Sequence, residues 1–74
     1  MTINKAILQI SRFSKEHNVL IKISVDYENM LVIIRRGDYV CARVMPISEI
    51  EAVKCDSVEI MLNNMIKELE KEEL

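Results

Sequence analysis

Three kinds of side chain in this sequence are able to do chemistry: one histidine, two cysteines and several carboxylates. His17 is the one residue suited to act as a general base, and Cys41 and Cys55 are the candidate nucleophiles. A nucleophilic site also needs a group that orients the base, and no nucleophile motif surrounds these three residues. We therefore expect no catalytic residue, and we interpret His17 as a histidine at the end of a helix.

The same residues make a poor metal or cofactor site. Zinc sites use Cys and His ligands in closely spaced pairs, whereas His17, Cys41 and Cys55 are widely separated. A phosphate-binding loop needs several glycines, and the chain holds one. Asp26 and Asp38 lie in predicted turns, where water solvates both carboxylates, whereas an acid/base pair needs one desolvated member. We expect no metal, no cofactor and no enzymatic activity.

Length and composition favour one soluble domain over residues 1–74. Half of the 74 residues are hydrophobic, 30% are charged, and the formal charge of −2 is too small to predict binding to nucleic acid or membrane by itself. No secretory signal opens the chain, and no apolar run reaches the roughly 18 residues that cross a bilayer. These observations, with two isolated cysteines interpreted as reduced thiols, predict a cytoplasmic protein.

The periodicity of apolar residues predicts the helices and strands that position these side chains. Apolar residues recur at helical spacing up to His17; Thr2 or Asn4 is the expected N-cap, Asn18 the expected terminator, and Leu8 points away from the stripe. Residues 19–25 then alternate with a period of two, which predicts a strand. After a turn at 26–29, strands are predicted over 30–35 and 39–44, joined by the two-residue loop Gly37–Asp38.

The C-terminal part returns to helical periodicity. Pro46 ends the sheet, and Ser48 and Glu51 have the spacing of a capping box, although the sequence leaves open whether residues 46–55 are helical. Asp56 is the expected N-cap of a helix, and the polar stretch from residue 67 is expected to fray. The predicted fold class is α+β: a three-stranded antiparallel meander flanked by an N-terminal and a C-terminal helix. The predicted C-terminal helix has an apolar stripe formed by Val58, Met61, Leu62, Met65, Ile66 and Leu69.

The loop at residues 37–38 predicts the register and therefore the two faces of the sheet. It places Ile34 opposite Cys41, Ile33 opposite Ala42 and Leu31 opposite Val44. We expect the wholly apolar set, Leu31, Ile33, Ala42 and Val44, to face the helices. The opposite, mixed face is the predicted interaction surface, with the alternative that the C-terminal helix or residues 46–55 cover it. Its candidate residues are Met30, Val32, Ile34, Arg36, Tyr39, Cys41 and Arg43.

These residues predict a protein-interaction module whose partner is another protein, and a homodimer through the mixed face, because pooled apolar surface stabilises so short a chain. The alternative is a nucleic-acid-associated protein that uses Arg35, Arg36, Arg43 and Tyr39. The element order is similar to that of double-stranded-RNA-binding domains, but the second helix begins with acidic Asp56 and Glu59 where that family has lysines. The acidic residues of the C-terminal half give a further alternative, in which the protein surface imitates nucleic acid toward a basic groove of its partner.

The chain resembles small accessory proteins of phages that infect low-GC Gram-positive bacteria. The resemblance rests on an isoleucine-, lysine- and glutamate-rich composition and on two closing patterns, Ile47-Ser-Glu-Ile-Glu and Ile66-Lys-Glu-Leu-Glu. The α-β-β-β-α order and acidic C-terminal half are also similar to some anti-CRISPR inhibitors. The resemblance implies a protein that acts in the host cytoplasm by binding and blocking a host effector, and it assigns no functional residue.

Overall fold

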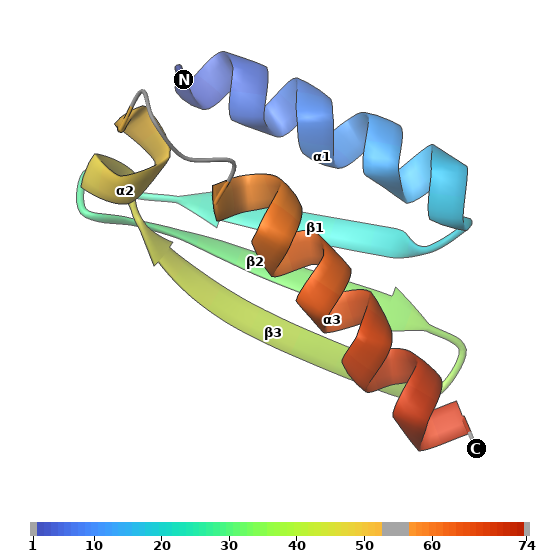
Figure 1. Ribbon diagram of the computed structural model, residues 1–74. Helices are drawn as coiled ribbons and strands as arrows, with labels where there is room; N and C mark the ends of the chain where they lie inside the picture. The colour runs from blue at the N-terminus through green and yellow to red at the C-terminus, as the bar shows by residue number, and fades with distance from the viewer. Residues whose placement is uncertain (1, 53–56, 74) are drawn as a thin grey trace.

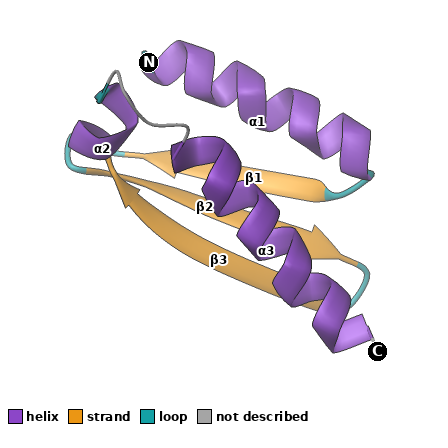
Figure 2. Cartoon of the chain, in the orientation of Figure 1, coloured by secondary structure: helices purple, strands orange, loops and turns teal. Residues whose placement is uncertain are grey.

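The computed structural model describes residues 2–52 and 57–73 and confirms the predicted fold class. The chain runs through α1 (Ile3–His17), β1 (Leu20–Val25), β2 (Asn29–Arg36), β3 (Tyr39–Pro46), α2 (Ile47–Glu51) and α3 (Ser57–Glu73). The strands form one antiparallel sheet in the order β1-β2-β3, and the helices make a second layer beside it (Figures 1 and 2).

Helix α1 begins and ends as its sequence predicts. The side chain of Thr2 accepts a hydrogen bond from the backbone N–H of Lys5, which satisfies a free donor of the first turn. Asn18 closes the helix in the left-handed conformation, with φ 53° and ψ 51°, and its backbone N–H donates to the carbonyl of Ser14. The buried stripe of α1 consists of Ala6, Ile10 and Phe13, so the helix packs on the sheet by that side.

The two turns of the meander fix its register. Gly37 takes φ 60°, which a glycine adopts without steric cost, and Ile34 pairs with Cys41 as predicted. In the first turn, a carboxylate oxygen of Asp26 accepts hydrogen bonds from the backbone N–H groups of Glu28 and Asn29 at 2.8 and 2.7 Å. These hydrogen bonds lower the pKa of Asp26. The β1–β2 register that follows places Lys22 beside Ile33.

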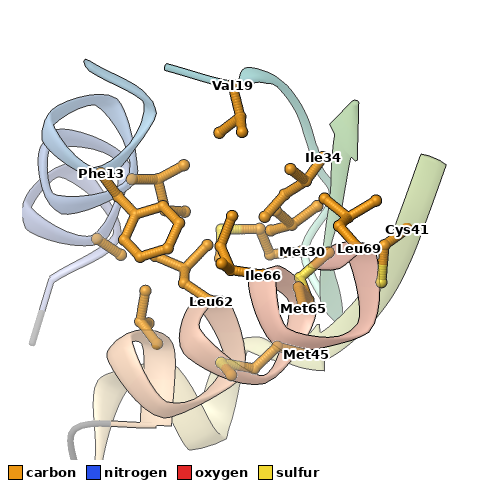
Figure 3. Close-up of a cluster of buried hydrophobic side chains, with 14 of the residues drawn as sticks. Phe13, Val19, Met30, Ile34, Cys41, Met45, Leu62, Met65, Ile66 and Leu69 are labelled. Carbon is orange, nitrogen blue, oxygen red and sulfur yellow. The ribbon is translucent and has the colours of Figure 1, made fainter. Parts of the chain in front are cut away.

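Both long helices lie on the same face of the sheet, and the expectation about which face they cover is wrong. Helix α1 packs against β1 and α3 against β3, and the face beneath them carries Met30, Val32 and Ile34, all fully buried. Figure 3 shows Met30 and Ile34 beside side chains of α3. The wholly apolar set, Leu31, Ile33, Ala42 and Val44, therefore lies on the uncovered face.

The C-terminal helices differ from the sequence prediction in two ways. Residues 47–51 do form a short helix, but its N-cap is Pro46 and no side chain caps it, so the capping box at Ser48 is wrong. The predicted cap Asp56 lies outside the described residues. The expected fraying is also wrong, because α3 continues to Glu73 and Leu69 is only 1% exposed against the core.

Candidate interaction surface

The two long helices lie on one side of the sheet (Figure 2). The opposite face presents an apolar strip to solvent. Side chains on one face of a sheet are two residues apart along each strand, and the register sets the rows across it. One row is Ser24–Leu31–Val44 and the next is Lys22–Ile33–Ala42. The third is Leu20–Arg35–Val40. We call the apolar residues of β2 and β3 in these rows the open strip: Leu31, Ile33, Val40, Ala42 and Val44.

The open strip is unusual for a sheet with one wet face. Antiparallel sheets of this kind normally alternate apolar residues inside with polar residues outside. Here Val40 and Val44 are 55% and 61% exposed, while Leu31 and Ile33 of the central strand are partly buried by their neighbours. Monomeric proteins seldom keep contiguous apolar surface of this kind unless another molecule binds it.

The cations of the uncovered face stand at its margins. Lys22 belongs to the edge strand β1, and Arg35 lies next to the hairpin, where its Nε donates to the carbonyl of Gly37 at 3.1 Å. The three strands, all of whose residues are described, place no carboxylate on this face. The centre of the face is therefore apolar and uncharged, with positive charge on the β1 side and at the hairpin end.

The structure divides the seven predicted interaction residues into two groups. Met30, Val32, Ile34 and Cys41 are buried under the helices of the same chain, so they belong to the core and are not surface residues. The physical reason is that α1 and α3 together cover the face that these four share with Ile21 and Ile23.

The other three candidates lie at the margin of the helix-covered face. Arg36 donates through Nη2 to the carbonyl oxygen of His17 at 3.1 Å, which ties the end of β2 to the end of α1. Arg43 forms an ion pair with Glu68 of α3, and Tyr39 is 37% exposed. Arg36 and Arg43 connect the sheet to the helices, and none of the three residues lies on the face of the open strip.

The cysteine predicted on the mixed face is held as a thiol. Cys41 Sγ donates a hydrogen bond to Glu68 Oε2 at 3.2 Å. Burial and this hydrogen bond raise the pKa of Cys41, while hydrogen bonds from Cys41 and Arg43 lower the pKa of Glu68. A thiol that ionises less readily than usual is a weak nucleophile at neutral pH, and the hydrogen bond links Cys41 of β3 to Glu68 of α3.

A groove lies between the two long helices. This groove of about 580 Å³ is open to solvent, and its lining includes Leu8, Phe13 and Leu62. Its charged lining has both signs, with Lys5 and Arg12 from α1 and Glu16 and Glu59 opposing them in charge. The groove therefore has no net electrostatic preference that would select a ligand.

The sequence of β1 contains a signal that identifies the uncovered face of the sheet. Residues 19, 21, 23 and 25 are all apolar, whereas Leu20 alternates with polar Lys22 and Ser24, so the second face of β1 is the more polar one. Pairing β1 with β2 through the 26–29 turn places Lys22 beside Ile33 and Ser24 beside Leu31. The face that holds Ile33 and Leu31 is thus the wet one. Val40, which was not predicted as a site residue, belongs to it.

Other kinds of site find little support in the described part of the chain. Within residues 2–52 and 57–73, no three or more His, Cys, Asp or Glu side chains are grouped as metal ligands. Over those same residues, no helix has the length and apolar character needed to cross a membrane. Comparison with protein-family models, with curated proteins and with solved structures gives no match.

Proposed function

We propose that this chain is a protein-interaction module that acts by binding and catalyses no reaction, and that its binding site is the open strip. The observation that carries the proposal is the exposure of Val40 and Val44 beside Leu31 and Ile33 on a face that no helix covers. The partner that fits such a surface is a protein with its own apolar patch, because burial of apolar area drives most protein–protein association.

The chemistry of the remaining side chains is consistent with a binding role. The Cys41 thiol is protonated and hydrogen-bonded, and His17 stacks on Phe13 with ring centroids 4.0 Å apart. The predicted phage origin and inhibitory role stay predictions; blocking a host effector would be one use of a module of this kind.

The alternative nucleic-acid function receives less support from the arrangement of its residues. Arg35 lies on the uncovered face, whereas Arg36, Tyr39 and Arg43 lie on the other side of the sheet. Arg36 and Arg43 also donate to His17 and Glu68 respectively. A phosphate-binding surface needs several cations on one side of the molecule, and these residues do not provide it.

Site-specific photo-crosslinking in cells that express the chain tests the proposal. A photoreactive amino acid replaces Val44 in the open strip or, as a matched control, Asn63, which is exposed on α3. We expect protein adducts of defined mass from position 44 and none from position 63. The absence of adducts at position 44, or equal adducts at both positions, would contradict the proposed function.

A further inference from the structure

We infer that the outer edge of β1 is a second binding site, which accepts an extended segment of a partner protein as a fourth strand of the sheet. The occupant is a strand without proline that alternates apolar with acidic residues. The site does not depend on the open strip, because it uses the backbone of β1, whereas the open strip consists of side chains of β2 and β3. A strand that adds to a sheet edge gains affinity mainly from backbone hydrogen bonds.

The backbone hydrogen-bond pattern shows which groups of β1 point outward. The N–H of Asp26 donates to the carbonyl of Asn29 at 3.0 Å, so these two residues form a hydrogen-bonded pair. Such pairs alternate with non-hydrogen-bonded pairs along an antiparallel ladder. Ile21, Ile23 and Val25 therefore direct their N–H and C=O groups away from β2. No hydrogen bond joins these outward groups to another residue in the described part of the chain.

The opposite edge of the sheet, along β3, is obstructed by two of its own residues. The same alternation, counted from the two-residue hairpin, turns the backbone groups of Val40, Ala42 and Val44 outward. Arg43 Nη1 donates to the carbonyl of Ala42 at 2.7 Å and so occupies the middle of this edge. Pro46 has no N–H to offer at the end of the strand. An edge without such obstruction is a template for pairing with another chain, and in this sheet that edge is β1.

The side chains of β1 define the chemistry of the added strand. On the helix side, Ile21 and Ile23 are partly buried against the core, Val25 is exposed, and α1 packs against the same strand (Figure 1). Apolar residues on this side of the added strand would cover that apolar surface. On the other side Lys22 is exposed, and the three strands place no carboxylate on that face. An acidic residue opposite Lys22 would form a cross-strand ion pair there.

Lys22 also argues against a second copy of this chain as the added strand. Two β1 strands paired at this edge would each carry a lysine on the same face of adjacent strands, where like charges destabilise the pairing. A lysine in an edge strand is a common device against pairing between identical chains. An acidic strand from another protein turns the same charge into an attraction, so Lys22 selects the partner.

Binding of a designed peptide, followed in amide NMR spectra of the whole chain, tests the inference. The probe is a seven-residue peptide that alternates glutamate with isoleucine and is capped at both ends. We expect saturable shift changes of the amide signals of Ile21, Ile23 and Val25 that exceed those of Val40 and Ala42. We also expect slower hydrogen exchange of the Ile23 amide in the complex, because its N–H then has a partner.

Two N-methylated peptides distinguish backbone pairing from simple apolar contact. The isoleucines of the probe lie opposite Ile21 and Ile23 in hydrogen-bonded pairs, so N-methylation of the isoleucines removes the donors that point at β1. N-methylation of the glutamates, the matched control, alters only donors on the far side of the added strand. We expect the first peptide to bind at least about tenfold more weakly than the second, the loss that follows from removing two or more hydrogen bonds.

Charge reversal at Lys22 tests the choice of an acidic strand. Lys22→Glu is expected to weaken binding of the glutamate peptide about fivefold and to favour a peptide with lysine in place of glutamate. Lys67→Glu, which makes the same change at an exposed position of α3, is expected to leave both affinities unchanged. Circular dichroism establishes that each variant is folded.

Several results would overturn the inference. They are shift changes that are absent or largest along β3, equal binding of the two N-methylated peptides, and equal binding of the glutamate peptide by the wild-type and Lys22→Glu chains. Protection of the Ile23 amide that rises with protein concentration in the absence of peptide would show that a second copy occupies the edge, and it would likewise contradict the inference.

Discussion

Cys41, Glu68 and Arg43 show how single side chains anchor α3 to β3. The thiol donates to one oxygen of Glu68 and Arg43 to the other, so both oxygens of one carboxylate bind the strand. The ion pair is half-exposed, and pairs of that kind contribute little stability on their own. Its value here is geometric, because it fixes where the outer part of α3 lies over β3.

The raised pKa of Cys41 gives a prediction for its reactivity. In a Cys55→Ser chain, we expect alkylation of Cys41 by iodoacetamide to rise only at pH values above the ordinary thiol range, measured from about pH 7 to pH 11. Glu68→Ala removes the hydrogen bond and the negative charge that raise this pKa, so the reaction should begin at lower pH.

The control for this prediction is Glu70→Ala, which removes an exposed carboxylate of the same helix and should leave the profile unchanged. The raised pKa of Cys41 also affects how the stability of the fold depends on pH. Because the folded-state pKa of the thiol is raised, its contribution to stability is complete below the ordinary thiol pKa and is lost as the pH rises through the raised value. Rapid alkylation at neutral pH would contradict the assignment.

At the scale of elements, the last turns of α3 belong to the folded core. Leu69 is almost completely buried and lies near Ile34 and Cys41 of the sheet (Figure 3). The polar residues around it made fraying the natural sequence prediction, because a single apolar residue in a charged segment is weak grounds for burial. The long sheet provides the surface against which this residue packs, and local sequence does not report that surface.

Substitution of Leu69 measures how much this end of the helix contributes. Leu69→Ala is expected to lower the free energy of unfolding by about 2 to 5 kcal/mol, the usual cost of a large-to-small change in a core. That is a large share of the stability of so small a domain. Lys67→Ala, at an exposed position two residues earlier, should cost less than about 0.5 kcal/mol in urea denaturation. Equal midpoints for the two variants would show that the helix end is frayed.

The strands and their register could be predicted because their determinants are local. Gly37 and Asp38 sit between two β-rich runs, and a two-residue loop admits one pairing, which places Ile34 opposite Cys41. Residues 30–34 are apolar on both faces, so β2 alone does not show which face the helices cover. That choice depends on β1, where Ile21 and Ile23 pair with Ile34 and Val32, and on two helices sharing one layer.

At the scale of the whole molecule, the fold has two layers, a sheet and a helical layer. Helices α1 and α3 both cover one face of the sheet, and within residues 2–52 and 57–73 no further long helix covers the other (Figure 1). A chain of 74 residues buries only about 60% of its unfolded surface. Binding of the proposed protein partner to the open strip would remove this apolar surface from water.

The central claim, that both long helices cover one face of the sheet and leave the open strip exposed, is tested most directly by solvent relaxation of methyl groups. A soluble gadolinium chelate broadens methyl signals according to their exposure. We predict that the Val32 and Ile34 methyls are protected from the chelate, whereas the Val40 and Val44 methyls are broadened. Broadening of Val32 together with protection of Val44 would contradict the account.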